Sequence, residues 1–377
     1  MRSAFTLSLG VWAGIILGPT FAGLASTASN DLFPSDVARN LTRGIASIMK
    51  EKNLPSVAVK VLVRGKGQYT FVDGFANLKT RAARTLEQPF RIASVTKTFA
   101  ATAILVLVDR GLLQKDDPIA KWYPDFPNAA RITVDDLLRM RSGIPAPNDD
   151  EVLAQVYDNP LARVPSLAKE LSSLAALKLQ FKTPNTEGVY TDFNYDILAG
   201  IVQQVTGKDI GVLISETVIK PLKLRHTSYP TGTALPGKLR GYGWNPETKR
   251  FDDKTMFNPP LAGAAGAVIS DLSDLVTFSR ALCQGDLLKP ETLREQMQGQ
   301  PLLGTNTNYG EGVALGHGFC GHSGTINGFS TDMYYIKKLD ASLIISVNRL
   351  DRDNESQSSQ IYALVGKTIL STLGPAE

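Results

Sequence analysis

The chain has 377 residues, of which 43% are hydrophobic and 20% are charged, with a formal net charge of +4. This length and composition suffice for one large hydrophobic core or two modest ones, and they exclude disordered, collagen-like and repeat proteins. Lysine and arginine are interspersed with acidic residues and form no basic clusters, so a nucleic-acid partner is not expected.

The amino-terminal segment is predicted to be a secretory signal peptide. Arg2 is its only charge, and its long apolar run ends in small residues that suit cleavage after Ala25 or Ala28. An uncleaved membrane anchor is the alternative, but a Gly-Pro pair interrupts the run and no basic stop-transfer cluster follows. We therefore expect removal of residues 1–28 and export of a mature domain, residues 29–377, to the periplasm or medium, with no stable membrane span.

The first predicted elements of the mature domain are a helix and a β-hairpin. Residues 36–52 place apolar side chains at helical spacing on one face. Residues 56–63 and 67–77 alternate as strands, and the Gly-containing turn between them is typical of a hairpin. A hairpin of this kind leaves a sheet edge that must pair with another part of the chain.

The middle of the chain is predicted to be mostly helical and its end to return to strands. Residues 98–113 are apolar on nearly all faces, which predicts a buried helix whose apolar centre is too short to cross a bilayer. Two antiparallel strands follow much later, at 329–338 and 341–349, before a last helix at about 358–373.

These elements predict an α/β (α+β) fold in a single unit with two lobes. An antiparallel sheet is built from both chain ends and flanked by helices, and a mostly helical lobe is inserted between them. We expect the sheet lobe at about 29–93 and 265–377 and the helical lobe at about 94–264. A cleft between two such lobes is a natural place for a binding site.

Cysteine and histidine are scarce. The two cysteines, Cys283 and Cys320, either form one disulfide or remain two buried thiols, and the sequence leaves both alternatives open. The three histidines, His226, His317 and His322, show neither metal-ligand spacing on a helix nor an acid–histidine zinc motif. We therefore expect a mechanism without a metal or a cofactor.

The pattern Ser-x-x-Lys occurs three times, at residues 47–50, 94–97 and 166–169. The first lies on a solvated helix face, and the serine of the third is an expected helix N-cap. Ser94 differs, because it stands where a loop enters the buried helix, with Lys97 one turn later on the same face. Burial disfavours an ammonium, so Lys97 could be neutral and take the serine proton, while the helix N-terminus favours developing negative charge.

Two downstream motifs support this choice. Tyr190-Thr191-Asp192 precedes an amphipathic helix, and His322-Ser323-Gly324 leads into the carboxy-terminal strands. With the Ser94 motif, these resemble the three ordered motifs of the penicillin-recognising serine hydrolases, the superfamily of D-alanyl-D-alanine carboxypeptidases, serine β-lactamases and related esterases. The resemblance covers nearly the whole mature chain, including the segments between the motifs, and implies a β-lactamase/DD-peptidase-like fold.

The resemblance assigns a role to each motif residue. Ser94 would be the nucleophile that forms an acyl-enzyme, Lys97 would accept its proton, and Tyr190 would pass a proton to the leaving nitrogen. The backbone N–H groups of Ser94 and Thr325 would form the oxyanion hole.

The third motif would line the substrate cleft. His322 stands where lysine is common in β-lactamases and many penicillin-binding proteins. Histidine there is typical of the group that resembles the D-alanyl-D-alanine carboxypeptidases of low molecular mass, and of some esterases and D-amino-acid peptidases. Its ordinary pKa near ~6.5 would make its charge pH-sensitive. Ser323 would offer a hydroxyl to a substrate carboxylate. Gly324 would let the substrate backbone approach closely, since it carries no side chain.

Asp192 departs from the family pattern, in which this position is usually asparagine. An ionised carboxylate only accepts hydrogen bonds. It would therefore bind Lys97 and oppose its role as a base, or select a substrate that carries an N–H or ammonium donor. A third alternative is that it caps the helix that begins at Phe193.

The sequence thus predicts an exported serine hydrolase without cofactors, acting on a small peptide, β-lactam or ester. The leading hypothesis is a D-alanyl-D-alanine carboxypeptidase that acts on cell-wall peptides and binds penicillin. An esterase or β-lactamase on the same scaffold is the first alternative, and a non-enzymatic β-lactam sensor or cell-wall-binding protein is the second. The oligomeric state is not predicted.

Overall fold

The structure of the protein is a computed structural model of the whole chain. The predicted signal peptide, residues 1–28, lies outside the residues that it describes, and so does His317. The described residues are 33–145, 157–163, 166–176, 179–180, 184–316, 318–353 and 355–374.

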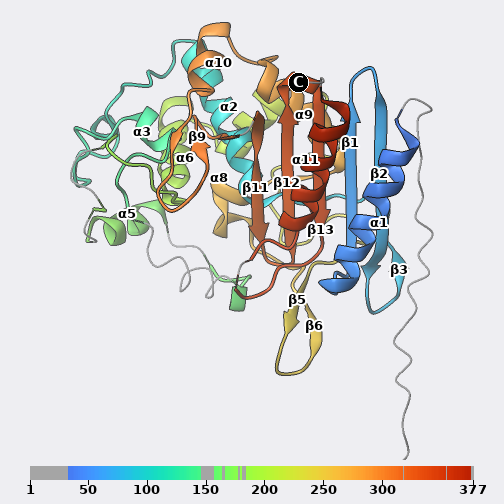
Figure 1. Cartoon of the computed structure of the whole chain (residues 1–377). Helices are drawn as coiled ribbons and strands as arrows, with labels where there is room; N and C mark the ends of the chain where they lie inside the picture. The colour runs from blue at the N-terminus through green and yellow to red at the C-terminus, as the bar shows by residue number, and fades with distance from the viewer. Residues whose placement is uncertain are drawn as a thin grey trace, which may run out of the picture.

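A nine-stranded antiparallel sheet forms the centre of the described part of the chain, in the order β3-β2-β1-β13-β12-β11-β10-β9-β8 (Figure 1). Both chain ends meet in its middle, because β1 (Ser56–Val63) pairs with β13 (Ala341–Val347). This pairing satisfies the open edge of the amino-terminal hairpin and confirms the predicted fold class. The other strands are β2 (Gly67–Asn77), β3 (Ala82–Ala83), β8 (Gln300–Pro301), β9 (Asn308–Tyr309), β10 (Ala314–Gly316), β11 (Phe319–Ile326) and β12 (Phe329–Ile336).

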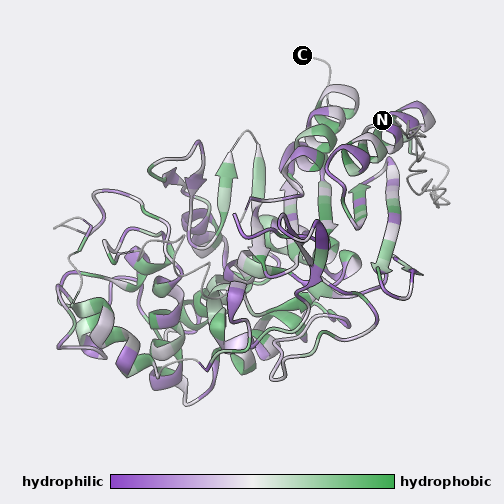
Figure 2. Cartoon of the chain, turned by 90° about the horizontal axis from the view of Figure 1, so that it is seen from below, coloured by the Kyte–Doolittle hydropathy of each residue, from purple (hydrophilic) through white to green (hydrophobic). Residues whose placement is uncertain are grey.

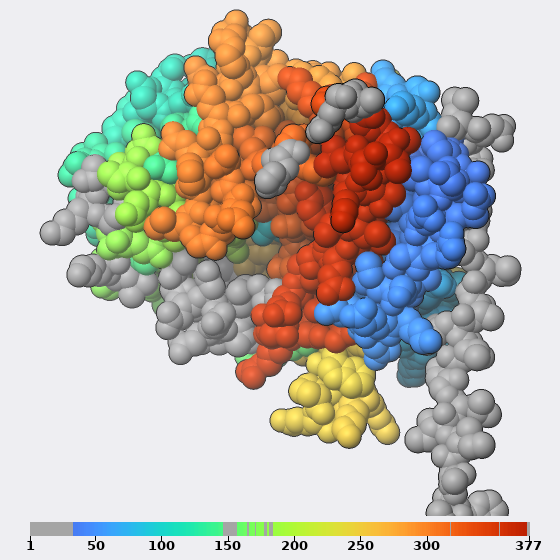
Figure 3. All heavy atoms as spheres, in the orientation of Figure 1, coloured from blue at the N-terminus to red at the C-terminus, as the bar shows by residue number. Residues whose placement is uncertain are grey.

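Two terminal helices, α1 (Ser35–Glu51) and α11 (Ser359–Leu373), cover one face of the sheet. In the space-filling view their atoms lie side by side on one face of the molecule (Figure 3). The ribbons of these outer helices carry hydrophobic and hydrophilic residues on different sides (Figure 2), as expected for helices with one buried face. Each aliphatic side chain buried at this layer stabilises the fold by about 1.5–3 kcal/mol.

The opposite face of the sheet packs against α9 (Leu272–Gln284), and α2 (Thr96–Asp109) lies behind it. Every residue of α2 from Thr96 to Leu107 is buried, which confirms the helix predicted to be apolar on all sides. A disulfide joins Cys283 of α9 to Cys320 of β11, so the first of the two alternatives for the cysteines holds. This bond fixes β11 to the helix beneath it.

The inserted segment is mostly helical, and one hairpin, β5 (Tyr242–Asn245) with β6 (Arg250–Asp253), projects from the body (Figure 1). The lobe boundaries near residues 94 and 265 stay predictions. The remaining elements are α3 (Val134–Leu138), α5 (Leu167–Ala175), α6 (Phe193–Thr206), α7 (Ile210–Ile214), a π-helical turn (Ser215–Ile219), α8 (Gly263–Gly266), α10 (Pro290–Gln296), β4 (Phe90–Arg91) and β7 (Ile269–Ser270).

Over the described ranges, no single helix has the length and hydrophobicity needed to cross a membrane. One pair of helices, Phe193–Thr206 and Ile210–Ile219, meets these criteria together, but with a bend of 80° between its halves.

Candidate active site

Ser94 lies in a 3₁₀ turn, Ala93–Val95, that leads directly into α2. The preceding residue, Ala93, is buried and has a φ of 49°, a left-handed conformation that costs an L-residue about 1–2 kcal/mol. The turn therefore stores strain immediately before the serine, and such strain persists only where the surrounding structure enforces it. The side chain of Ser94 caps no helix, since α2 begins after Val95 without a side-chain cap.

Lys97 connects the members of the site. Its side chain has no exposed surface, and its ammonium donates to Ser94 Oγ at 3.0 Å and to the carbonyl oxygen of Ala265 at 3.0 Å. Its third contact is an ion pair with Asp192 Oδ1 at 2.6 Å. An ammonium has three N–H donors, so these three acceptors use all of them.

This arrangement favours the charged form of Lys97. Burial by itself would lower the pKa of the amine, but the Asp192 carboxylate and Tyr190 outweigh it, and the pKa is raised. The expectation that burial leaves Lys97 neutral is therefore wrong for this resting arrangement. Of the three alternatives for Asp192, the contact with Lys97 is the one observed. Its side chain does not cap α6, although the residue occupies the N-cap position.

Tyr190 stands across the same ammonium. The Lys97 nitrogen lies 4.8 Å from the centre of the Tyr190 ring. Burial raises the pKa of the Tyr190 hydroxyl, and the neighbouring lysine offsets this only in part. A resting phenolate is therefore disfavoured, so in this state neither residue is a free base.

His322 is buried behind the site and is neutral. Its Nδ1 contacts the carbonyl oxygen of Ser323, so this nitrogen carries the hydrogen, and its Nε2 accepts from the hydroxyl of Tyr309 at 3.0 Å. Burial, with the charge of Lys97, lowers the pKa of His322 to about 4. The expected titration near ~6.5 is therefore moved to a more acidic range.

Gly324 is required by the fold of the chain itself. A Cβ at this position would lie 2.5 Å from the carbonyl oxygen of Ile92, 2.8 Å from the Ser94 nitrogen and 2.9 Å from the Ala93 Cβ. The space that the missing side chain leaves is thus occupied by the turn that carries Ser94. The absence of a side chain at Gly324 thus allows β11 to pack against this turn, and the close approach of a substrate backbone stays a prediction.

A cavity of about 1390 Å³ opens over the site. Ser94, Tyr190, Asp192 and Thr325 all line it, whereas Lys97 is buried beneath it. The other third-motif residues do not line it: His322 is buried, and the side chain of Ser323 is exposed elsewhere. The structure thus brings the first two motifs and Thr325 together, and the catalytic roles assigned to them stay predictions.

Two residues of the site belong to none of the three sequence motifs. Ala265 contributes only a backbone carbonyl, and an alanine carries no sign of such a role. Tyr309 holds His322 from the two-residue strand β9, which is too short to show a period. For Tyr309, the one signal in the sequence is its position near a glycine-rich loop.

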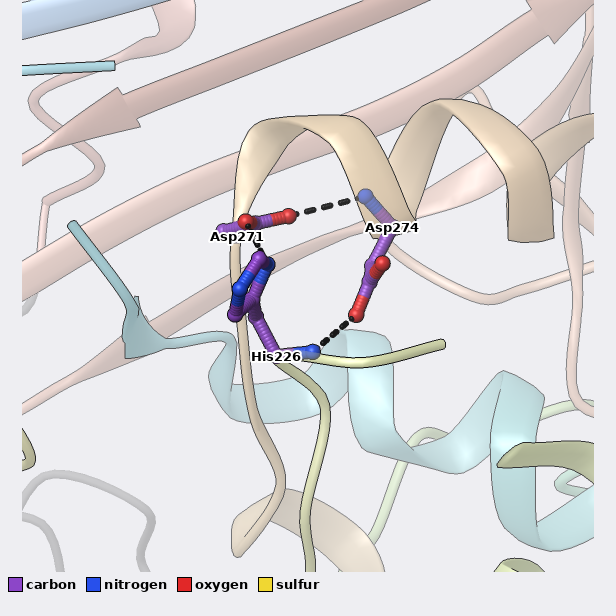
Figure 4. A group of neighbouring side chains, drawn as sticks. All are labelled: His226, Asp271 and Asp274. Atoms are coloured by element: carbon purple, nitrogen blue, oxygen red, sulfur yellow. Dashed lines mark hydrogen bonds and ion pairs between the residues drawn. The ribbon is translucent and has the colours of Figure 1, made fainter. Parts of the chain in front are cut away.

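A second group of polar side chains, His226, Asp271 and Asp274, lies away from this cavity (Figure 4). Asp271 accepts from His226 Nδ1 at 2.7 Å and from two backbone N–H groups at the start of α9. Asp274 accepts from the His226 backbone N–H and from the Thr227 hydroxyl. These contacts describe a capped helix end tied to a neighbouring loop.

The fold and the site define the class of the protein: a serine hydrolase with its Ser-x-x-Lys pair at the entrance of a buried helix. The sequence profile of the family described as Beta-lactamase matches residues 41–365. The chain belongs to this family.

Two relatives among known proteins extend this assignment. PbpX of Bacillus subtilis (strain 168), which bears the name of a penicillin-binding protein, is 27% identical over 335 residues, covering 86% of this chain and 78% of PbpX. Unguisins hydrolase ungD' of Aspergillus campestris (strain IBT 28561) is 23% identical over 365 residues, covering 87% of this chain and 66% of that protein.

Solved structures give a similar result. The D-stereospecific amidohydrolase from Streptomyces sp. has a TM-score of 0.74 and 29% identity, covering 91% of this chain and 99% of that chain. The D-amino acid amidase from Ochrobactrum anthropi SV3, in complex with L-phenylalanine amide, has a TM-score of 0.80 and 25% identity. The alignment covers 90% of this chain and 99% of the amidase.

Proposed function

We propose that the protein hydrolyses the amide bond on the carboxyl side of a D-amino acid, through an acyl-enzyme on Ser94. The observation that carries this proposal is the hydrogen bond of 3.0 Å between Lys97 and Ser94 at the floor of the cavity. Two structural relatives bear the names of D-stereospecific amide hydrolases and align over 99% of their chains. They support both the D-configuration of the substrate and the amide as the bond that is cleaved.

The proposed reaction has two steps. Ser94 Oγ forms a bond to the amide carbon while its proton passes to Lys97, and the carbon–nitrogen bond then breaks as Tyr190 delivers a proton to the leaving amine. Backbone N–H groups of Ser94 and Thr325 stabilise the oxyanion. Lys97 passes the proton that it accepted to Tyr190, and water then cleaves the ester, with its hydroxyl joining the acyl carbon and its hydrogen returning to Ser94 Oγ. Lys97 must release one proton before the first step, because the resting arrangement holds it charged.

D-alanyl-D-alanine carboxypeptidase activity on cell-wall peptides is one form of this reaction, in which the substrate nitrogen is acylated, and it is tested beside free D-amino-acid amides. A side-by-side comparison should use D- and L-alanine p-nitroanilide, a D-Ala-D-Ala peptide, a short acyl ester and a chromogenic cephalosporin. We expect turnover of D-configured amides that is lost in Ser94→Ala. A large preference for the ester or the cephalosporin would contradict the proposal and favour an esterase or β-lactamase.

We also propose that the protein is exported. The apolar segment at residues 4–29 supports this, and so does the Cys283–Cys320 disulfide, because such bonds persist mainly in oxidising compartments. Cell fractionation, combined with amino-terminal sequencing of the mature protein, tests both export and cleavage. Recovery of the intact amino terminus from the cytoplasm would contradict this proposal.

A further inference from the structure

Asp192 has a free oxygen that faces the cavity. Its Oδ1 is held by Lys97, and among the described residues no hydrogen bond or ion pair occupies its Oδ2. Its side chain is 54% exposed, in contrast to the fully buried lysine beneath it. The carboxylate is thus fixed in place by one oxygen and presents the other to whatever enters the cavity.

The distance between Asp192 and the nucleophile Ser94 suits the α-nitrogen of an amino-acid substrate. Asp192 Oδ1 and Ser94 Oγ both contact the same nitrogen, Lys97 Nζ, at 2.6 and 3.0 Å, so they lie within two hydrogen-bond lengths of each other. In an amino-acid amide, the α-nitrogen is about 2.5 Å from the carbonyl carbon, given the bond lengths of the backbone. A carbonyl carbon poised about 3 Å from Ser94 Oγ can therefore place its α-nitrogen against Asp192.

The charge of the cavity points to the same group. Its described lining has five acidic and two basic residues, and three of the acidic ones are ion-paired: Asp158 with Arg352, Asp351 with Arg349 and Asp192 with Lys97. Near the nucleophile, Lys97 has no donor left for a substrate carboxylate, and His322 is neutral. A cationic substrate is therefore favoured over an anionic one. The acidic residues of the lining are Asp158, Asp192, Asp196, Asp209 and Asp351.

We propose that Asp192 binds the α-ammonium group of the substrate, so that the protein acts on D-amino-acid amides and peptides with a free amino terminus. This rests on the proposed function and narrows it, since a cell-wall carboxypeptidase acts on an acylated nitrogen. An N-acyl group removes both the charge and the donors that Asp192 accepts.

The same contact gives the substrate a part in activating the site. An ammonium beside Asp192 competes with Lys97 for the one carboxylate that the lysine contacts among the described residues. This weakens the interaction that favours the charged lysine, whereas burial, which disfavours the charge, remains. Lys97 then releases its extra proton to water and accepts the proton of Ser94 as the acyl bond forms.

A matched pair of substrates tests this inference: D-alanine p-nitroanilide and its N-acetyl derivative. We expect the wild type to prefer the free amine in kcat/KM by about tenfold to a hundredfold, the range of one charge-assisted hydrogen bond. In Asp192→Asn the preference should collapse, because the free amine loses rate while the N-acetyl substrate keeps or gains it. Asp125→Asn, which removes an exposed carboxylate outside the cavity lining, is the control and should keep the preference.

Other outcomes separate this inference from the function on which it rests. A purely structural role of Asp192 in holding Lys97 would slow both substrates equally, and a wild-type ratio near one would overturn the inference while leaving amide hydrolysis intact. If neither substrate is cleaved, the proposed function fails as well. A test without any mutation uses D-lactic acid p-nitroanilide, in which a hydroxyl replaces the ammonium. It should be cleaved as poorly as the N-acetyl compound, and rapid cleavage contradicts the role of Asp192.

Discussion

Two regions of the molecule carry the same four-residue pattern and differ in everything that surrounds it. At 94–97 the lysine is fully buried and bound to the serine, a carbonyl and a carboxylate. At 166–169 both side chains are exposed, and the Ser166 hydroxyl accepts from the backbone N–H of Lys169 as a helix cap. The motif is the same, so burial and the acceptors around the lysine decide whether it performs chemistry or ends a helix.

The largest expected difference between these regions is in catalysis. Ser94→Ala should lower kcat/KM for D-alanine p-nitroanilide by at least about a thousandfold, because it removes the nucleophile. Ser166→Ala should leave the rate within about twofold. Covalent labelling of the wild type by a fluorescent penicillin, read by gel or mass spectrometry, locates the reactive serine. Labelling that persists in Ser94→Ala would show that Ser94 is not the reactive serine and would contradict the proposed difference between the two regions.

Gly324→Ala tests whether the region at 94–97 depends on the packing of its turn against β11. The added Cβ has only backbone atoms and the Ala93 Cβ to meet, so the turn must move. A displacement of this kind should lower kcat by about tenfold to a hundredfold and destabilise the fold by about 1–3 kcal/mol. Gly65→Ala is a comparison in open space, with a strained φ but no close atoms. It should reduce stability without lowering kcat.

The neutral His322 predicts a pH dependence of stability. Its folded pKa of about 4 lies below the unfolded value near 6.5, so the unfolded state binds more protons between these values. The stabilisation is complete above about pH 6.5 and is lost as the pH falls toward 4, by about 2 kcal/mol between pH 7 and 5.

This contribution is measured as a difference between proteins. Denaturant unfolding at pH 7 and pH 5 should show that the wild type loses more stability on acidification than His322→Asn does. Burial raises the pKa of Asp332 to about 6, so protonation of Asp332 increases stability as the pH falls. This effect is present in both proteins and cancels in the difference between them. Parallel pH curves for the two proteins would show that His322 keeps its ordinary pKa.

The smallest effect belongs to the exposed motif. Ser166→Ala removes a long cap hydrogen bond of 3.4 Å from a nine-residue helix and should cost about 0.5–1 kcal/mol. Thermal unfolding should therefore shift by only a few degrees, with unchanged catalysis. A loss of several kcal/mol would mean that this exposed region supports more of the fold than its contacts indicate.

The sequence was sufficient for the long elements and for the place of the nucleophile. The alternating valines of β1, the apolar run of β13 and the apolar helix α2 each extend over many residues, so their patterns are clear. Strands β8, β9 and β10 have two or three residues and show no period, which is why they were not predicted. Their pairing depends on the neighbouring strand instead of their own composition.

The electrostatics of the site were harder to predict, because they depend on distances. The sequence placed Lys97 and Asp192 near one active site but left open whether they touch. An ion pair of 2.6 Å reverses the expected effect of burial on the lysine. Likewise, the neutral state of His322 depends on its burial and on the nearby charge of Lys97, neither of which the motif itself identifies.

The close approach of Gly324 to the turn of Ser94 has a consequence for biosynthesis. The nucleophile is translated early, but the strand that fixes its turn is translated late, and β13 must insert between β1 and β12 to complete the sheet. A nascent chain that lacks β11 therefore contains Ser94 without the strand that packs against its turn. Any hydrolysis at Ser94 therefore requires that the chain has been translated through β11 and folded, so the topology separates synthesis of the serine from completion of its site.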